Sequence, residues 1–418
     1  MKLTIKNSGQ KFFTATVLAV IIFAVTSLAA TLFFTDCTVP KVPEEQPPPE
    51  EQPLPEAQKP QTATITFIAA GDNLIHDIIY NRARVKAGED TFNFDPSYDY
   101  IRPIIKKADI AFVNQETVLG GRQFGHSGYP VFNTPQDAGL GLINAGFNVI
   151  NHASNHAMDR GEGAVFGTMD FWDGKNILYL GIFRSEEQRK TEKRIMEKNG
   201  IKAGFLSYTY GLNGFPLPRD KPWLVGLINK ETMAREIDEL RPLCDLLVVS
   251  MHWGSEFRHT VNENQKQLAV FMAEHKVDVI IGHHPHVTEP VEVIPRPDGG
   301  MLTVYYSLGD FLSHTQADET PDTMTGALAY MTITKTFTRE QSSCTVTTAG
   351  VIPTVSHYTT QRTEPFVVYP LWDYTDELAA KHIKKKITVK YLNSVARNIF
   401  GSRIIEKEYY ENEKYYGN

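Results

Sequence analysis

Clusters of Asp, Glu, Asn and His are the parts of this 418-residue chain best suited to chemistry. Six of them are, in chain order, Gly71-Asp72-Asn73, Asn114-Gln115-Glu116, Asn151-His152-Ala153-Ser154-Asn155-His156, His252-Trp253-Gly254, Gly282-His283-His284-Pro285-His286 and Ser307-Leu308-Gly309-Asp310. Carboxylate, imidazole and amide oxygen together form a ligand set that suits Mn, Zn or Fe. The potential ligands outnumber the four of a closed structural zinc site. The set therefore predicts two divalent metals about 3.5–4 Å apart, as in binuclear hydrolases.

The triplet His284-Pro285-His286 is informative in its spacing. In an extended segment, residues i and i+2 share one face. We therefore expect both imidazoles to reach the same site, with the proline stiffening the turn between them.

Apolar runs typical of strands buried on both faces precede these clusters. The predicted strands are residues 64–70, 109–114, 147–151, 201–208, 245–252, 277–282 and 302–307. Residues 135–145, 230–240 and 264–275 have the apolar spacing of helices, and the alternation predicts an α/β fold. Ligands bind beyond the carboxyl ends of strands in such sheets, so the clusters predict one shared polar site. Residues 327–335 and 344–354 predict further β-structure on the main sheet.

Composition excludes several classes of protein. The chain has 42 Lys+Arg against 49 Asp+Glu and a formal net charge of −7, so no nucleic-acid partner is expected. Its 3 Cys have no paired spacing, which disfavours a disulfide framework and a thiolate metal site. A phosphate-binding Gly-x-x-x-x-Gly-Lys-Ser/Thr loop and a Gly-x-Ser-x-Gly nucleophile elbow are both absent from the sequence. An ATPase and a serine hydrolase are therefore disfavoured.

The N-terminal part of the chain predicts a membrane anchor and a stalk. Residues 12–34 carry no charge, lysines precede them, and Asp36 follows. This pattern predicts a transmembrane helix over residues 12–35, with residues 1–11 in the cytoplasm; a cleaved signal peptide is the alternative. Residues 36–61 are rich in Pro and Glu and predict an extended stalk. The protein would then cross the cell membrane once. Its extracytoplasmic part would comprise a main domain, residues 62–355, and a C-terminal helical extension, residues 356–418.

The clusters also carry a family resemblance. The motifs GDNLIH, NQE, NHASNHAMDRG, HWG, GHHPHV and YSLGDF, in this order, resemble those of the CapA family of poly-γ-glutamate capsule biosynthesis proteins. The domain of that family is similar to calcineurin-like metallophosphoesterases, and the resemblance covers residues 63–315. It implies a four-layer sandwich of mixed sheets flanked by helices, with a metal-dependent hydrolase or transferase site.

Roles for individual residues come with the resemblance. The implied metal ligands are Asp72 and His286 for the first metal, Asn155, His252 and His284 for the second, and Glu116 between the two. The resemblance implies that His156 protonates the leaving group or holds the scissile oxyanion. Asp159 either orients an imidazole or caps the N-terminus of a helix.

The sequence departs from the metallophosphoesterase pattern at its first motif. Where the pattern has Asp-x-His, this chain has Leu74 as the third residue, so the first metal lacks one ligand. Three roles are open for His76: it replaces that ligand, it contacts substrate, or it caps the next helix. We count it among the candidate catalytic residues. Residues expected to contact substrate or to support the ligands are Asn73, Asn114, His152, His283 and Asp310.

Three functions fit these residues. The first is a membrane-anchored protein for synthesis, export or attachment of an anionic surface polymer, which the resemblance identifies as poly-γ-glutamate. The second is a metallophosphoesterase acting on nucleotides or lipid-linked phosphates. The third is a non-catalytic, metal-stabilised scaffold of a membrane complex for polymer synthesis or export. The expected partners are the polymer or its precursor, that complex and the membrane itself.

Overall fold

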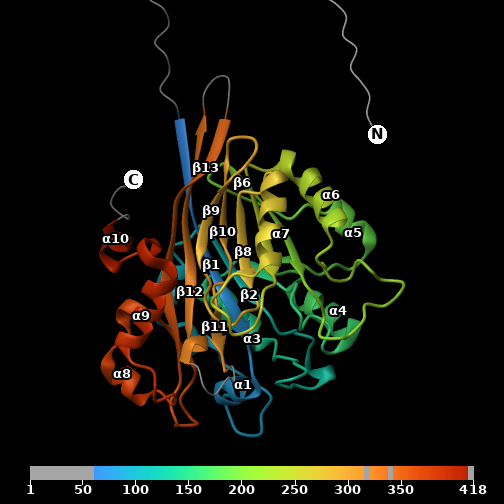
Figure 1. The fold of residues 1–418 in the computed structure, drawn as a ribbon. Helices are drawn as coiled ribbons and strands as arrows, with labels where there is room; N and C mark the ends of the chain where they lie inside the picture. The colour runs from blue at the N-terminus through green and yellow to red at the C-terminus, as the bar shows by residue number, and fades with distance from the viewer. Residues whose placement is uncertain (1–60, 315–320, 338–341, 413–418) are drawn as a thin grey trace, which may run out of the picture. The chain divides into compact units, whose positions relative to one another are not determined.

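Two mixed β-sheets form the centre of the fold in the computed structural model, which describes residues 61–314, 321–337 and 342–412 (Figure 1). The eight-stranded sheet has the order β14-β13-β12-β1-β2-β3-β4, and β11 pairs with β1 beside that path. Its strands are β1 (Gln61–Leu74), β2 (Ile110–Gln115), β3 (Val149–Asn151), β4 (Leu178–Leu180), β11 (Asp310–Ser313), β12 (Thr325–Phe337), β13 (Ser342–His357) and β14 (Val367–Pro370).

The six-stranded sheet has the order β5-β6-β7-β8-β10-β9. Its strands are β5 (Ile195–Lys198), β6 (Ile201–Thr209), β7 (Leu246–His252), β8 (Val279–His283), β9 (Val291–Pro295) and β10 (Met301–Tyr305). Neighbours are parallel from β1 to β4 and from β6 through β7 and β8 to β10. The carboxyl ends of these parallel strands therefore gather at one edge of each sheet.

Helices cover the sheets. They are α1 (Asp77–Ala83), α2 (Arg102–Ile105), α3 (Asp137–Ala145), α4 (Gly161–Trp172), α5 (Glu186–Thr191), α6 (Lys230–Leu240), α7 (Glu263–Glu274), α8 (Asp376–Lys381), α9 (Val389–Phe400) and α10 (Lys407–Asn412). Short 3-10 turns lie at Asp95–Tyr98, Arg122–Phe124, Arg241–Leu243, Pro321–Met324, Leu371–Asp373 and Gly401–Arg403. Figure 1 shows α6 and α7 beside the six-stranded sheet and α8 to α10 beside β12 and β13. The predicted α/β fold is confirmed.

The hydrophobic core joins the two sheets. Phe67 of β1 meets Phe205 of β6 edge to face, with ring centroids 6.1 Å apart, and both side chains are buried. Burial of one such ring contributes roughly 2–3 kcal/mol to folding. A second core, which includes Met233 of α6 and Met272 of α7, lies between these helices and the six-stranded sheet. The core around Phe67 and Phe205 fixes the two sheets against each other and so fixes the distance between their polar edges.

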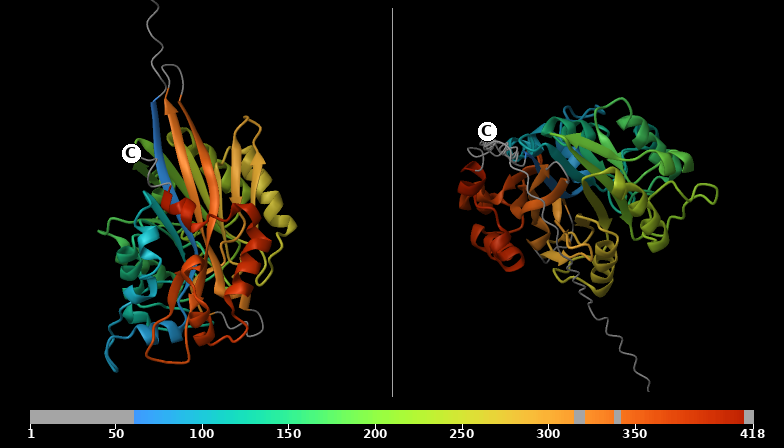
Figure 2. Two further views of the ribbon diagram at one scale, coloured as in Figure 1. Left: turned by 90° about the vertical axis from the view of Figure 1, so that its left-hand side faces the viewer. Right: turned by 90° about the horizontal axis from the view of Figure 1, so that it is seen from above.

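The residues after 355 first complete the eight-stranded sheet and only then form helices. The predicted boundary at residue 355 lies two residues before the end of β13, and β14 extends the same sheet. Figure 2 shows the long β12 and β13 beside β1, as their registers require. The predicted anchor at 12–35 lies outside the described residues, as does the predicted stalk apart from Gln61. No helix within the described part of the chain is long and apolar enough to cross a membrane.

Candidate metal centre

The polar clusters meet where the carboxyl ends of the two sheets face each other. In the eight-stranded sheet, Asp72 of β1 is in register with Asn114 of β2 and with Asp310 of β11. In the six-stranded sheet, His252 of β7 is in register with His283 of β8. The first sheet thus contributes mainly carboxylates and amides, and the second contributes imidazoles.

Three groups of side chains are close enough to hold a metal ion. Within each group the ligand atoms all lie within 4.8 Å of one another; the groups are Asp72, Glu116 and His252; Asp72, His286 and Asp310; and Glu256, His284 and His286. Asn155 joins them through its Oδ1, which lies 2.8 Å from His252 Nε2. All six residues predicted as metal ligands therefore lie together.

Several ligand atoms of this centre are buried without a hydrogen-bond partner among the described residues. They are both carboxylate oxygens of Glu116, Nδ1 of His252 and Nδ1 of His284. Burying a carboxylate without a donor costs free energy that a bound cation offsets. The donor set, oxygen and imidazole nitrogen around unsatisfied buried atoms, therefore fits divalent cations.

Burial and neighbouring charges set the protonation of the carboxylates. Burial raises the pKa of Asp72, but the neighbouring imidazoles of His283 and His286 outweigh burial and lower the pKa below its ordinary value. Burial and the charge of Asp72 raise the pKa of Glu116 well above its ordinary value. The two acids differ because Asp72 has hydrogen-bond donors around it, whereas Glu116 has none among the residues that the structure describes.

The imidazoles also differ from one another. Burial lowers the pKa of His284 to about 3 and lowers the pKa of His252 well below its ordinary value. Both rings are therefore neutral, the form that binds metals. Burial also lowers the pKa of His286, but the charges of Asp310 and Glu116 outweigh burial and raise it well above 6.5.

The His284-Pro285-His286 segment reaches the site by a different backbone from the one expected. We predicted an extended segment, but His284 has φ 98° and His286 has φ 58°, both in the left-handed region. The extended interpretation is wrong because the chain turns here, between β8 and β9. The two rings still lie close together, with centroids 6.0 Å apart. Left-handed residues other than glycine are strained, and such strain gathers at functional sites.

His156 and Asp159 form a pair beside the ligand groups. His156 Nδ1 lies 2.7 Å from Asp159 Oδ2, which also accepts the backbone N–H of Phe132 at 2.7 Å. Asp159 does not cap α4, whose N-cap position is Arg160. The structure thus places the carboxylate where it orients the imidazole.

The predicted supporting residues lie in two settings. Asn114 Nδ2 donates to Asp72 Oδ1 at 2.7 Å, and His283 Nδ1 lies 3.3 Å from the same oxygen. Asp310 Oδ1 lies 2.9 Å from His286 Nδ1. Asn73 and His152 are turned into the core instead; their partners there are Gln115 and Tyr98 for Asn73, and Trp172 for His152.

His76 belongs to none of the three ligand groups found among the described residues. Its side chain is buried at the N-cap position of α1 but makes no capping hydrogen bond. Its ring packs edge to face on Phe132, with centroids 5.3 Å apart, and Phe132 in turn packs on His156. His76 therefore shares a packing partner with His156: the Phe132 ring contacts both imidazoles.

Three residues at this edge were not predicted from the sequence. Tyr210 stands over His284 with ring centroids 4.6 Å apart, and Asn213 Oδ1 accepts from Asn155 Nδ2 at 3.2 Å. Both follow β6, whose predicted strand end has no cluster of Asp, Glu or His to draw attention. The third, Glu256, lies just beyond the predicted cluster at residues 252–254, in the loop that follows β7.

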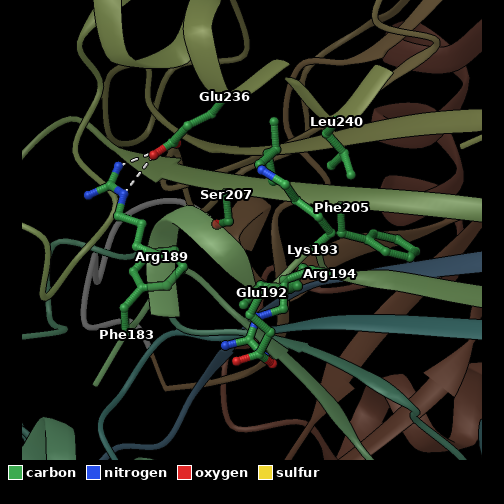
Figure 3. Close-up of a pocket in the computed structure, with 12 residues that line it drawn as sticks. Phe183, Arg189, Glu192, Lys193, Arg194, Phe205, Ser207, Glu236 and Leu240 are labelled. Atoms are coloured by element: carbon green, nitrogen blue, oxygen red, sulfur yellow. Dashed lines mark hydrogen bonds and ion pairs between the residues drawn. The ribbon is translucent and has the colours of Figure 1, made fainter. Parts of the chain in front are cut away.

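A separate cavity of about 30 Å³ lies between β4, β6, α5 and α6 (Figure 3). Arg189 Nε pairs there with Glu236 Oε1 at 2.7 Å. None of the residues that line this cavity was predicted as a site residue. It is therefore distinct from the candidate metal centre.

Relatives and solved structures resemble this chain. It is 28% identical over 259 residues to the PGA biosynthesis protein CapA of Bacillus subtilis (strain 168), covering 61% of this chain and 66% of that protein. It is 25% identical over 250 residues to the capsule biosynthesis protein CapA of Bacillus anthracis, covering 57% and 58%. The chain thus matches less than two thirds of the length of each relative.

Among solved structures, the NAD nucleotidase NadN of Haemophilus influenzae is similar at 13% identity and a TM-score of 0.43, covering 85% of this chain and 67% of that one. A putative 5'-nucleotidase of Staphylococcus aureus is similar at 12% identity and a TM-score of 0.39, covering 79% and 58%. The model of the bacterial capsule synthesis protein PGA_cap matches residues 66–315, which include every predicted site residue. This match spans more than half of the sequence, and the chain therefore belongs to the PGA_cap family of bacterial capsule synthesis proteins.

Proposed function

We propose that this protein is a metal-dependent hydrolase or transferase that serves the synthesis, export or attachment of an anionic surface polymer. The observation that carries the proposal is the buried Glu116 carboxylate, which has no hydrogen-bond donor among the described residues and faces the neutral imidazole of His252. Family membership supports the polymer as substrate, and the family name points to poly-γ-glutamate.

In this proposal the chain holds two divalent cations, Mn, Zn or Fe, with the six predicted ligands. The ions supply Lewis-acid polarisation of a phosphoryl or acyl oxygen. Asp159 accepts the Nδ1–H of His156, so the imidazolium form of His156 presents its Nε2–H to the departing atom and returns to the neutral imidazole when that proton leaves. Tyr210, half exposed above His284, lies on the side from which substrate enters.

The proposal also includes the setting of the protein. Residues 12–35 anchor it in the cell membrane, residues 36–61 form the stalk, and a four-layer sandwich of the calcineurin-like type lies outside the cell. There it acts within a membrane complex for polymer synthesis or export. The apolar run and the lysines before it support this orientation.

A scaffold without catalysis is the second candidate, and Leu74 favours it. Leu74 is buried and offers no ligand where the metallophosphoesterase pattern has a histidine. A metal centre with one ligand fewer can stabilise a fold without activating a substrate.

Metal content and turnover of the full chain separate these functions. We expect about two divalent ions per chain, lost in the variant H284A/H286A. We also expect hydrolysis of γ-glutamyl polymers or phosphoesters that the variant H156Q abolishes while it keeps the metal. Metal without turnover on either substrate class would support the scaffold. Absence of metal after loading with Mn or Zn would contradict both candidates.

A further inference from the structure

Glu256 lies at the metal centre although it comes from a loop rather than from a strand end. Its carboxylate groups with His284 and His286, with all ligand atoms within 4.8 Å. The two histidines are buried, whereas Glu256 is exposed. Glu256 therefore approaches the two imidazoles from the solvent side, whereas the carboxylates of Asp72 and Asp310 near His286 are buried.

The loop that carries Glu256 is fastened to the turn that carries the two histidines. The backbone N–H of Phe257 donates to Pro285 O at 2.8 Å, and Phe257 has φ 60°, a strained conformation for this residue. His259 Nδ1 lies 2.6 Å from Thr288 O. Because both anchors lie on residues 285–288, the carboxylate keeps its place relative to His284 and His286.

No lysine or arginine side chain of the described residues lies within 4.0 Å of the Glu256 carboxylate to form an ion pair. The surroundings of Glu256 thus combine two imidazoles with a carboxylate that has no cationic partner in the described part of the chain, which is a cation-binding arrangement.

We propose that Glu256 is a metal ligand at the solvent-facing side of the centre, where it binds a divalent cation together with His284 and His286. It supplies a carboxylate ligand to a centre that lacks one ligand at Leu74. This inference rests on the metal centre of the proposed function but not on its substrate.

Metal titration of the full-length E256Q variant tests the proposal. We expect Mn²⁺ or Zn²⁺ to bind at least about tenfold more weakly at one site, measured by calorimetry and by metal content after dialysis. The matched control is E263Q, which removes an exposed carboxylate at the start of α7 whose Oε1 contacts Gln267, away from the histidines. Unfolding of both variants in EDTA should match the wild type, because both side chains are exposed.

The outcomes distinguish failure of the Glu256 ligand role from failure of the proposed function. Unchanged metal affinity in E256Q would overturn the ligand role and leave the metal centre standing. Lower turnover with unchanged metal affinity would also overturn it, because Glu256 would then act on substrate. A wild-type chain that binds no metal would overturn both the inference and the proposed function.

Discussion

The two sheets place their side chains at the candidate metal centre by different means. On the eight-stranded side, hydrogen bonds hold the groups: Asn114 Nδ2 donates to Asp72, and Asn151 Nδ2 donates to Asn114 Oδ1, each at 2.7 Å. On the six-stranded side, His284 and His286 are positioned by a left-handed backbone. Hydrogen bonds between these groups stabilise the fold with or without metal. The strained backbone of His284 and His286 costs free energy, which is offset only when the two imidazoles bind a ligand.

Glu116 breaks this division, because it belongs to the eight-stranded side but has no hydrogen bond to its carboxylate among the described residues. We expect E116Q to weaken metal binding about a thousandfold, or roughly 4 kcal/mol, since it removes a charged ligand. The metal-free protein should gain about 1–3 kcal/mol of unfolding free energy at pH 8, because a buried charge is removed. Metal content and urea unfolding in EDTA measure the two effects.

Asp72 is the matched control for Glu116. D72N should also lose metal, but it should lower the stability of the metal-free protein. The Asp72 carboxylate accepts from Asn114 Nδ2 and from the backbone N–H of His284, so its charge is stabilised in the fold. Changes of the same sign in the two metal-free variants would contradict the comparison between satisfied and unsatisfied carboxylates.

Asn114 tests the hydrogen-bonded placement itself. N114A leaves Asp72 and Asn151 each without one buried hydrogen bond, so we expect a loss of about 2–4 kcal/mol in unfolding free energy. Metal affinity should fall about 10–100-fold, because a ligand loses its support. N144A is the control, since Asn144 makes its hydrogen bonds to Asp95 on the surface. Equal effects of the two variants would show that the network does not hold the site.

Glu289, which follows β8 of the six-stranded sheet, is a second buried carboxyl that tests the comparison between satisfied and unsatisfied carboxylates. Burial raises its pKa to about 7; Gln265 donates to one oxygen, and the other has no partner among the described residues. The folded state therefore binds a proton that the unfolded state releases above about pH 4.5, so stability falls as pH rises from there to about 7. E289Q should match the wild type near pH 4.5 and exceed it by about 2–3 kcal/mol at pH 8. Denaturant unfolding at both pH values measures this, and a pH-independent difference would contradict the assignment.

The presence of the main strands and the positions of their ends were largely predictable, because apolar runs and the polar residues after them are local signals. The predicted helix 230–240 coincides with α6, and Asp72, Glu116, His252 and His284 lie together as their strand ends required. Short edge strands such as β5 and β9 were not predicted, since partly exposed residues alternate there without a continuous apolar run.

The parts of the site that escaped prediction depend on tertiary packing. Glu256 and Tyr210 reach the histidines from loops, and the course of a loop is fixed by contacts such as the hydrogen bond from Phe257 to Pro285. The conformation of His284 was missed because a positive φ at a histidine has no signature in its neighbours. His76 was a candidate because it lies two residues after Leu74, where the family pattern has a histidine ligand, but its ring packs on Phe132 instead.

The central position of β1 has a consequence for biosynthesis. This strand is the first of the described chain, yet it pairs with β12 along residues 61–70, and Asp72 pairs in register with Asp310. A ribosome must therefore extend the chain as far as Leu328, the partner of Ala70, before the pairing with β12 can begin. Pairing over such sequence distances is slow and leaves apolar strands open to aggregation. The nascent chain is therefore expected to need a chaperone that keeps β1 from aggregating until β12 has been synthesised.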